Sequence, residues 1–280
     1  MQLRTLVENN YSRQDEIIQI AGDLLGFSKE QITLHFNALK INKNQISKIK
    51  TSLNALQSGV PLPYLLKKYY FFNSALFINR AVLIPRFETE VLVLKTLQLL
   101  ENISNATIID IGTGSGNIII ALAKARGNKD QYFAVDISKS ALKVAQKNAQ
   151  CNKVDKIKFY QSDLMENKKL PRQFDVLVAN LPYLNSDYLA ALPEKLSKKL
   201  YFEPRLALDG GRDGMKTISR LLNDLPTRMH QNSIAIIEID SRQKDQVITM
   251  CKANGLTPKT IKDLNNRVRF VEIRKATRQA

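Results

Sequence analysis

The sequence predicts an α/β fold: a small all-helical domain, a β-hairpin, and a Rossmann-like, mostly parallel sheet whose last strand runs antiparallel. Two observations support this prediction. Apolar residues recur at helical spacing through much of residues 12–59. From residue 107 onward, short β-branched runs alternate with helical stretches, which is the order typical of a doubly wound parallel sheet.

Composition sets broad limits on the kind of protein. The chain has 280 residues, of which 44% are hydrophobic, so it can form one large core and a small second one. Cys151 and Cys251 are too few for a disulfide framework, and His35 and His230 have no metal-ligand spacing. We therefore expect a reducing, cytoplasmic location and no metal site. No signal-peptide pattern begins the chain, and its longest apolar run, 118–123, is too short to span a membrane.

The formal net charge is +16, which favours polyanionic or acidic partners through long-range attraction. Much of the excess is lysine spread along the chain, and such residues usually form only a solvated surface. Two denser groups of basic residues could instead form a docking face. They are Lys195, Lys198, Lys199 and Arg205, and Arg267, Arg269, Arg274, Lys275 and Arg278.

The N-terminal part is expected to contain amphipathic helices followed by a hairpin. Ser12 is a candidate N-cap for the first helix, and Gly26 ends it. Residues 61–64 contain two prolines and interrupt the helical pattern, and aromatic and β-branched runs flank Asn73 and Ser74, predicting a hairpin over 69–78. The expected helices cover residues 12–26, 29–39 and 44–59.

The C-terminal part alternates between strands and helices. A helix opens within residues 83–90 and runs to Leu100, ahead of the sheet. The last strand follows the element before it by only a few residues, around 265–266, which is too short for a helical crossover and requires an antiparallel strand. The expected strands are 107–111, 132–136, 157–161, 174–179, 234–239 and 267–274, and the expected helices between them are 118–124, 141–151 and 215–222.

A glycine-rich turn follows the first strand of the predicted sheet. Gly112, Gly114 and Gly116 let the backbone turn tightly and let a ligand approach it, and the helix that follows offers free N–H groups to an anion. A dinucleotide-binding fingerprint would need its third glycine at position 117, where Asn117 stands. The spacing instead suits S-adenosylmethionine, whose carboxylate is small and whose bulk lies across the loop.

Acidic residues end the next two strands. Asp136 is placed to accept both ribose hydroxyls of a nucleoside, and Asp163 with Leu164 offers the adenine an acceptor and an apolar surface. A simpler interpretation is also open, because an acid after a strand is often a helix N-cap, as Asp136 could be for the helix near Ser140.

The strand at 174–179 stops at Asn180-Leu181-Pro182-Tyr183. The side-chain oxygen of Asn180 and the backbone carbonyl of Leu181 can together accept both hydrogens of an NH2 group, and Tyr183 can stack on the planar group that bears it. The same residues could also form an ordinary Asx-proline turn. Because the glycine loop, both acids and Asn180 follow successive strands, we expect them at one edge of the sheet.

Four segments resemble the bacterial release factor glutamine methyltransferases. They are Leu-Ile-Pro-Arg-Phe-Glu-Thr-Glu at 83–90, the loop at 110–116, Asn-Leu-Pro-Tyr at 180–183, and Phe-Glu-Pro-Arg-Leu-Ala-Leu-Asp-Gly-Gly at 202–211. The likeness covers nearly the whole chain, and the Ile-Pro-Arg segment is its most specific part. It implies a class I S-adenosylmethionine-dependent methyltransferase fold with a seven-stranded sheet. The implied domains are a helical substrate-binding domain at 1–64, a hairpin linker at 65–85 and a methyltransferase domain at 86–280.

The resemblance also implies an activity: methylation of the glutamine side-chain nitrogen in the Gly-Gly-Gln loop of class 1 peptide chain release factors, with S-adenosylhomocysteine as the product. Catalysis and substrate binding are assigned to Asn180, Leu181, Pro182 and Tyr183. The cofactor contacts are Gly112, Thr113, Gly114, Ser115, Gly116, Asp136, Asp163, Leu164 and Asn180. We expect a monomer without a membrane partner or a direct nucleic-acid substrate, although the basic surface could contact RNA.

The sequence departs from the family at two positions and leaves two other functions open. The family usually has proline at Leu181, so we expect the same chemistry with a slightly looser loop, and it tends to have glycine at Asp240. The main alternative is an adenine N6 methyltransferase acting on DNA or ribosomal RNA, because Asn-Leu-Pro-Tyr is also similar to the motif of ribosomal RNA adenine dimethylases. Another is a binding module that has kept the fold without activity.

Overall fold

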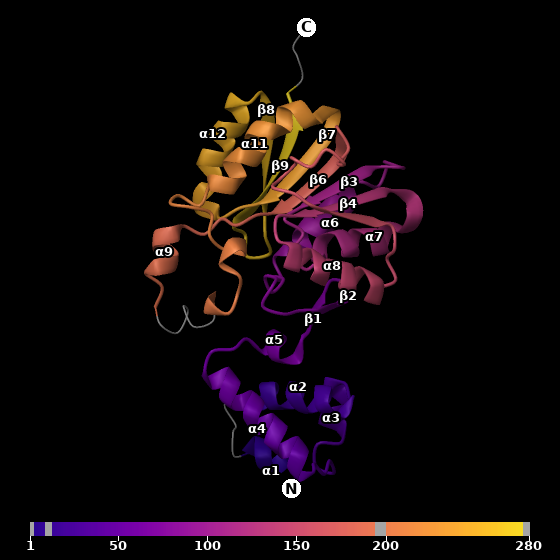
Figure 1. Cartoon of the computed structure of the whole chain (residues 1–280), viewed down its shortest axis with the longest axis vertical. Helices are drawn as coiled ribbons and strands as arrows, with labels where there is room; N and C mark the ends of the chain where they lie inside the picture. The colour runs from indigo at the N-terminus through magenta and orange to yellow at the C-terminus, as the bar shows by residue number, and fades with distance from the viewer. Residues whose placement is uncertain (1–2, 9–12, 194–199, 277–280) are drawn as a thin grey trace. The chain divides into compact units, whose positions relative to one another are not determined.

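A computed structural model of the chain describes residues 3–8, 13–193 and 200–276. The chain divides into two compact units, one formed by residues 1–67 with 194–202 and the other by residues 68–193 with 203–280. The first unit is helical and the second contains a seven-stranded sheet (Figure 1). The domain boundaries inferred from the sequence, at 64 and 85, stay predictions.

The helical unit packs around buried isoleucines, among them Ile17, Ile32 and Ile49. Gly26 ends the second helix in the left-handed conformation, as its position indicated. Ser28 and Asn42 each cap a helix through a reciprocal hydrogen-bonded box. The helices of this unit are α1 (Leu3–Glu8), α2 (Gln14–Leu25), α3 (Lys29–Leu34), α4 (Lys43–Gln57) and α5 (Leu62–Leu66).

Two features of this unit differ from the prediction. The second predicted helix ends at Leu34 rather than near residue 39, because Phe36 and Leu39 reach the core from a turn and need no further helix. The prolines near residue 62 begin a short helix instead of only ending one, since proline is well suited to a helical first turn. The predicted cap at Ser12 lies outside the described residues.

The second unit contains the hairpin and the sheet. Its strands are β1 (Lys68–Phe71), β2 (Ser74–Phe77), β3 (Thr107–Ile111), β4 (Gln131–Asp136), β5 (Ile157–Gln161), β6 (Phe174–Asn180), β7 (Met229–Glu238), β8 (Leu256–Lys262) and β9 (Val268–Lys275). Its helices are α6 (Thr89–Leu99), α7 (Asn117–Arg126), α8 (Lys139–Cys151), α9 (Ser186–Ala190), α11 (Lys216–Arg228) and α12 (Lys244–Ala253). The hairpin turns at Phe72 and Asn73, one residue earlier than predicted.

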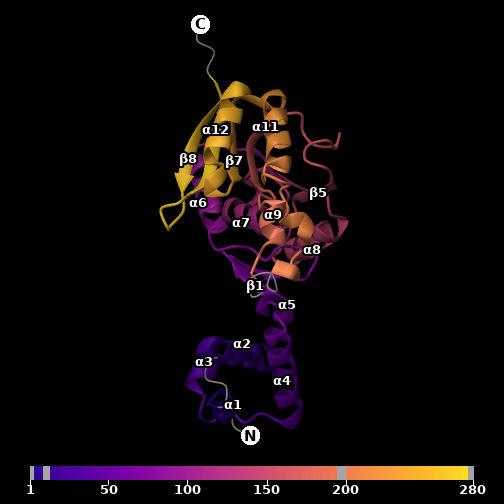
Figure 2. The ribbon, with the colours of Figure 1, turned by 90° about the vertical axis from the view of Figure 1, so that its left-hand side faces the viewer.

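The strands of the large sheet follow the order β5-β4-β3-β6-β7-β9-β8, and β9 runs antiparallel to both of its neighbours. The predicted mostly parallel sheet with an antiparallel last strand is therefore confirmed. The pattern of the sequence did not identify β8. This edge strand buries only Leu256 fully and exposes Lys259 and Lys262, so it lacks a clear apolar alternation (Figure 2).

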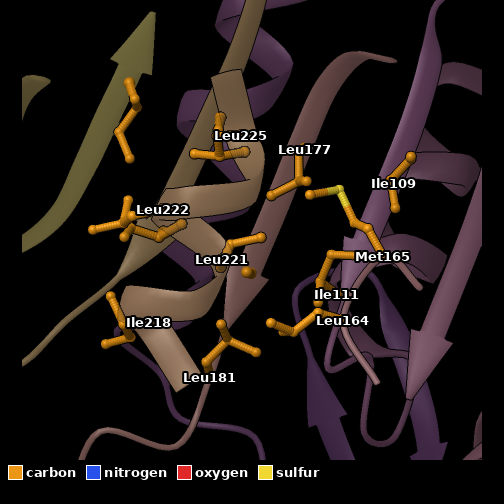
Figure 3. Close-up of a cluster of buried hydrophobic side chains, with 14 of the residues drawn as sticks. Ile109, Ile111, Leu164, Met165, Leu177, Leu181, Ile218, Leu221, Leu222 and Leu225 are labelled. Atoms are coloured by element: carbon orange, nitrogen blue, oxygen red, sulfur yellow. The ribbon is translucent and has the colours of Figure 1, made fainter. Parts of the chain in front are cut away.

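Helices cover both faces of the sheet, with α11 and α12 on one and α6, α7 and α8 on the other (Figure 1). Ile109 and Leu177 of the central strands lie in one buried cluster with Leu221 of α11. Figure 3 shows Leu164 and Leu181 in the same cluster. The hydrophobic core therefore extends to the sheet edge at which the predicted site residues lie. Leu164 and Leu181 are anchored in it.

Candidate active site

A pocket of about 310 Å³ lies at the carboxyl ends of the parallel strands β3, β4 and β6. Ligands bind at this edge in open α/β sheets. The predicted site residues that line the pocket are Gly112, Thr113, Gly114, Ser115, Asp136, Asp163, Leu164, Asn180, Leu181 and Pro182. Two predicted residues, Gly116 and Tyr183, do not line it.

The glycine-rich loop is held to strand β4 by its own backbone. The N–H groups of Gly112 and Thr113 both donate to the carbonyl of Val135 at 2.8 Å. Gly116 has a φ of 81° and serves helix packing, because a Cβ there would lie 2.9 Å from Ile120 Cδ1 and 3.2 Å from Ala145 Cβ. The loop thus combines a ligand-facing part with a part that packs α7 against α8.

Asp110 is the next-to-last residue of β3 and is fully buried. The Thr113 hydroxyl donates to Asp110 Oδ2 at 2.7 Å, which ties the loop to the strand. Burial raises the pKa of Asp110 to about 7, partly offset by that hydrogen bond. Asp110 therefore supports the loop from inside and does not line the pocket.

Asp136 closes the loop from the side of β4. Its carboxylate accepts hydrogen bonds from the N–H groups of Gly114 at 2.9 Å and Ser138 at 2.8 Å. The N-cap of α8 is Ser138, whose side chain accepts from Ala141 N, so the simpler interpretation of Asp136 as the N-cap is wrong. Burial raises the pKa of Asp136, and its two backbone donors oppose that shift.

Asp163 and Leu164 form the next part of the pocket wall. Arg220 of α11 approaches both carboxylate oxygens of Asp163, at 3.1 and 3.0 Å, and also pairs with Glu166. Leu164 has a φ of 47°, which is unusual for a residue with a side chain, and its side chain is buried in the core. The role of these residues toward an adenine stays a prediction.

Asn180 ends β6, and its side chain is fixed by hydrogen bonds. Its Nδ2 donates to Glu238 Oε2 at 3.0 Å and to Thr89 Oγ1 at 3.2 Å. The Thr89 hydroxyl in turn donates to Glu238 Oε2 at 2.7 Å. Since Nδ2 is engaged within the protein, Oδ1 is the part of the Asn180 amide left for a ligand.

Tyr183 lies close to the same carboxylate. Its hydroxyl donates to Glu238 Oε1 at 3.2 Å, and burial raises its pKa, with the charge of Glu238 adding to that shift. The phenol is therefore a hydrogen-bond donor at neutral pH. Stacking of this ring on a substrate amide stays a prediction.

Two glycines hold the loop at 180–184 in place. Leu184 exchanges backbone hydrogen bonds with the neighbouring segment, donating to Leu208 O and accepting from Gly210 N. A Cβ on Gly210 would lie 2.7 Å from Pro182 O, and one on Gly214 would lie 2.3 Å from Tyr183 O. The loop after β6 thus depends on a close backbone approach that only glycine permits.

The Ile-Pro-Arg segment meets the segment that begins at Glu203. The buried carboxylate of Glu203 accepts from Ile84 N at 3.1 Å and from Arg86 Nη2 at 2.7 Å. Pro85, Arg86 and Pro204 line the pocket. Two motifs that are 117 residues apart therefore form one wall of the site.

Comparison with known proteins assigns the chain to a family. It is 32% identical over 240 residues to the release factor glutamine methyltransferase of Bacillus subtilis (strain 168), covering 82% of this chain and 81% of that protein. The same enzyme of Francisella tularensis subsp. tularensis (strain SCHU S4 / Schu 4) is 33% identical, with 91% and 88% covered. The chain belongs to the release factor glutamine methyltransferase family.

Broader comparisons agree on the fold. Residues 102–267 match the family described as "Methyltransferase domain", and residues 32–169 match "Protein-L-isoaspartate(D-aspartate) O-methyltransferase (PCMT)". The ribosomal protein L11 methylase of Lactobacillus delbrueckii subsp. bulgaricus superimposes with a TM-score of 0.50 at 19% identity, covering 69% of this chain and 81% of that protein. This structural likeness shows a methyltransferase fold and no more.

The release factor glutamine methyltransferase family uses S-adenosylmethionine, and the pocket fits this cofactor. Gly112 lines the pocket with a φ of 73°, and a Cβ there would lie 3.1 Å from the Leu181 side chain, so glycine lets this loop lie against the loop after β6. Asp136 keeps acceptor capacity beyond its two backbone donors. Ile137 and Leu164 supply apolar pocket surface. Acceptors for hydroxyls next to apolar surface suit a nucleoside.

The two departures from the family have local explanations. Leu181 is 4% exposed and packs into the core, so its side chain anchors the loop that we expected to be looser. Asp240 has a φ of −73°, which does not require glycine, and it caps the short turn at Ser241–Gln243. Gln243 of that turn donates from Nε2 to Tyr183 O at 3.0 Å, which links this turn to the loop after β6.

Several residues of the site were not identified individually from the sequence, among them Thr89, Glu203 and Glu238. Thr89 and Glu203 lie within the segments 83–90 and 202–211 that resemble the family. Glu238 gave a signal of its own, because it interrupts the apolar run at 234–239, and a carboxylate buried among apolar residues needs partners.

The basic clusters are partly outside the described residues, since Lys195, Lys198, Lys199 and Arg278 are not described. The described members largely bond within the chain. Arg205 pairs with Asp209, Arg274 with Glu272 and Arg269 with Asp263, while Lys275 donates to backbone carbonyls. Among the described residues, no helix is long and apolar enough to cross a membrane, and no group of three or more metal-binding side chains occurs.

Proposed function

We propose that this chain methylates the side-chain amide nitrogen of the glutamine in the Gly-Gly-Gln motif of class 1 peptide chain release factors, using S-adenosylmethionine. Membership of the release factor glutamine methyltransferase family supports the substrate. The proposal implies a role in translation termination and a cytoplasmic location, where release factors act.

The observation that supports this chemistry best is the pair of acceptors at the end of β6. Asn180 Oδ1 is left for the ligand because Nδ2 is engaged by Glu238 and Thr89. The carbonyl of Leu181, which also lines the pocket, accepts no hydrogen bond from the described residues. Two acceptors on adjacent residues match the two hydrogens of a carboxamide NH2 group.

The residues of the site would act by positioning. An amide nitrogen is a weak nucleophile because its lone pair is delocalised into the carbonyl. When Asn180 Oδ1 and the Leu181 carbonyl accept both N–H bonds, the lone pair can be directed out of the amide plane toward the methyl group. The bound cofactor supplies that methyl from a sulfonium, whose sulfur keeps the electron pair of the broken bond. The nitrogen then loses one proton to solvent, and preorganised acceptors supply most of the catalysis.

We further propose that the helical unit at 1–64 binds the release factor and that residues 65–85 link it to the methyltransferase domain at 86–280. The chain is proposed to act as a monomer without a direct nucleic-acid substrate. Because several described basic residues pair within the chain, its large net charge does not by itself require a nucleic-acid partner.

The test is methyl transfer from labelled cofactor to a purified release factor. The label should enter the wild-type release factor but not one whose Gly-Gly-Gln glutamine is replaced by alanine. Asn180→Ala should lower transfer at least about a hundredfold while cofactor affinity stays within about tenfold. Asn223→Ala, at an exposed position on α11, is the matched control and should leave both unchanged.

The same assay distinguishes the alternative, an adenine N6 methyltransferase. Label in DNA or ribosomal RNA oligonucleotides, with none in the release factor, would contradict the proposal and favour that function. Label in neither, with the cofactor bound, would favour a binding module without activity. A loss of cofactor binding in Asn180→Ala would show that Asn180 holds the cofactor rather than the acceptor nitrogen.

A further inference from the structure

Glu238 is a carboxylate at the centre of the site that does not line the pocket. It ends β7, is 1% exposed, and lies directly beside Asn180 in the register of the two parallel strands. Its two oxygens accept hydrogen bonds from Asn180 Nδ2, the Thr89 hydroxyl and the Tyr183 hydroxyl. Each of these neighbours is therefore oriented as a donor toward Glu238.

We infer that Glu238 is a positioning residue that determines the specificity of the site for a carboxamide over a carboxylate. It does so by fixing which end of the Asn180 amide faces the pocket. This inference rests on the proposed function, because it concerns the acceptor pair that would hold the substrate glutamine.

The Asn180 amide is nearly symmetric in shape. The oxygen and nitrogen of a carboxamide have almost the same size, so packing alone hardly selects between the two orientations of Asn180. An ionised carboxylate is acceptor-only, and turning the amide would bring Asn180 Oδ1 to about 3 Å from Glu238 Oε2, where two partly negative oxygens repel. Glu238 therefore allows one orientation, in which Nδ2 faces the protein.

Thr89 completes this arrangement. The two acceptors of Asn180 Nδ2, Glu238 Oε2 at 3.0 Å and Thr89 Oγ1 at 3.2 Å, are themselves 2.7 Å apart, so both face the same side of the amide. With Nδ2 turned toward this pair, the Asn180 oxygen is the atom that faces the substrate. The acceptor pair would then bind two N–H donors, while a glutamate side chain would place its negative oxygens against two carbonyl oxygens.

Three hydrogen-bond donors and one cation surround Glu238 and oppose the effect of its burial. Burial raises its pKa, but the hydrogen bond from Thr89, the charge of Arg269 on β9 and the hydroxyl of Tyr183 each lower it. Glu88 is the other facing acid, and its charge raises the pKa. Glu238 thus combines full burial with three donors and one nearby cation.

The test compares Glu238→Gln with the wild type on two forms of one release factor, carrying glutamine or glutamate in the Gly-Gly-Gln motif. Transfer to the glutamine form gives kcat and KM, and the glutamate form is assayed as a competitive inhibitor. A glutamine side chain at 238 can donate as well as accept, so it permits the turned orientation of Asn180. We expect the ratio of inhibitor Ki to substrate KM to fall at least tenfold, with cofactor affinity unchanged.

A matched control is Glu272→Gln, which changes another buried carboxylate, on β9, bonded to Arg274 at 2.7 Å. It should leave the discrimination ratio as in the wild type. Thr89→Val, which removes one acceptor of Nδ2, should lower the ratio, and Thr89→Ser, which restores the hydroxyl, should recover it. If Glu238→Gln fails to fold, the two Thr89 variants test the inference in its place. Their control is Thr96→Val, which changes another buried threonine of the same helix.

The outcomes separate this inference from the proposed function. Inactivity of the wild type toward the glutamine form would overturn the proposed function and this role with it. If the wild type is active but Glu238→Gln has the same ratio of Ki to KM, only the role of Glu238 is overturned. If Glu238→Gln does not fold, an unchanged ratio in Thr89→Val leads to the same conclusion. The role of Glu238 is also overturned if the ratio of Ki to KM falls equally in Glu238→Gln and in Glu272→Gln, because an equal fall would reflect lost stability only.

Discussion

The two loops that form the pocket follow neighbouring parallel strands, yet they keep their shapes by different means. The glycine-rich loop after β3 is held mainly by residues next to it in sequence or on the adjacent strand. Its backbone donates to Val135 O, Thr113 donates to Asp110, and Gly114 donates to Asp136. Its conformation is largely a local property of the motif.

The loop after β6 depends on residues far away in the chain. Thr89 and Glu238 fix Asn180, Gly210 and Gly214 allow close backbone contact, and Gln243 donates to Tyr183 O. The difference indicates that the cofactor side of the site will tolerate distant substitutions, whereas the acceptor side will not. A substitution in one loop should therefore leave the function of the other loop intact.

The largest effect is expected for Gly214→Ala. The added Cβ would lie 2.3 Å from Tyr183 O and 2.4 Å from Gln243 Nε2, at a residue with a φ of 75°. Overlap and backbone strain together should lower the free energy of unfolding by about 4 kcal/mol or more. In the protein that still folds, methyl transfer should be lost while cofactor affinity is kept, because the glycine-rich loop is not displaced. Urea denaturation and cofactor titration measure the two effects.

Gly26→Ala is the control for that variant. Gly26 has a φ of 70° and a ψ of 26°, but a Cβ there would meet nothing within 4 Å, so only the backbone strain of about 1–2 kcal/mol remains. If the two variants lose the same unfolding free energy, the close contact of Gly214 with Tyr183 O does not contribute to stability as expected. Loss of cofactor binding in Gly214→Ala would contradict the independence of the two loops.

A smaller effect is expected from replacing Asp110, which supports the glycine-rich loop. This effect is a change in how the free energy of unfolding depends on pH. Because burial raises the pKa of Asp110 to about 7, the folded state holds its proton more tightly than the unfolded state does. Its contribution to stability is therefore complete below about pH 4 and is lost as the pH rises through about 7. Relative to Asp110→Asn, the wild type should lose about 2 kcal/mol of unfolding free energy between pH 5 and pH 7.

Urea denaturation of both proteins at several pH values measures that difference. The asparagine can still accept from Thr113, so the loop should keep its shape and cofactor affinity should change little. Parallel pH profiles for the two proteins would contradict the raised pKa of Asp110. Asp110 is expected to take no part in methyl transfer. If the rate of transfer depends on pH in the wild type but not in Asp110→Asn, this expectation is wrong.

The same contrast explains which parts of the site could be predicted from the sequence. The glycine-rich loop and Asp136 were found because glycine spacing and a carboxylate after a strand have direct local meanings. Strand alternation placed both at one sheet edge, and the short spacing before β9 fixed its direction. Asn180 and Leu181 were found in the same way, since a polar amide and a proline end an apolar strand.

The supports of the second loop could not be predicted in this way. Whether Glu238 reaches Asn180 depends on the register between β6 and β7, and whether Glu203 reaches Arg86 depends on how two loops meet. No periodicity encodes either contact. Strand β8 was missed for a different reason, because an exposed edge strand needs little apolar alternation. The sequence therefore indicated the chemistry of single residues, but it did not indicate which distant segments contact each other.

The smallest effect is expected at Asp240, which supports the second loop only through Gln243. Asp240 caps the turn by accepting from Arg242 N at 2.9 Å, so Asp240→Ala should cost about 1 kcal/mol of unfolding free energy. Asp240→Gly, which introduces the residue usual in the family, should cost only a few tenths of a kcal/mol because glycine is tolerated at an N-cap. Methyl transfer should stay within about twofold in both, since Gln243 keeps its bond to Tyr183 O. A glycine variant more stable than the wild type would show that this turn prefers glycine after all, and that the aspartate is retained for a purpose other than capping.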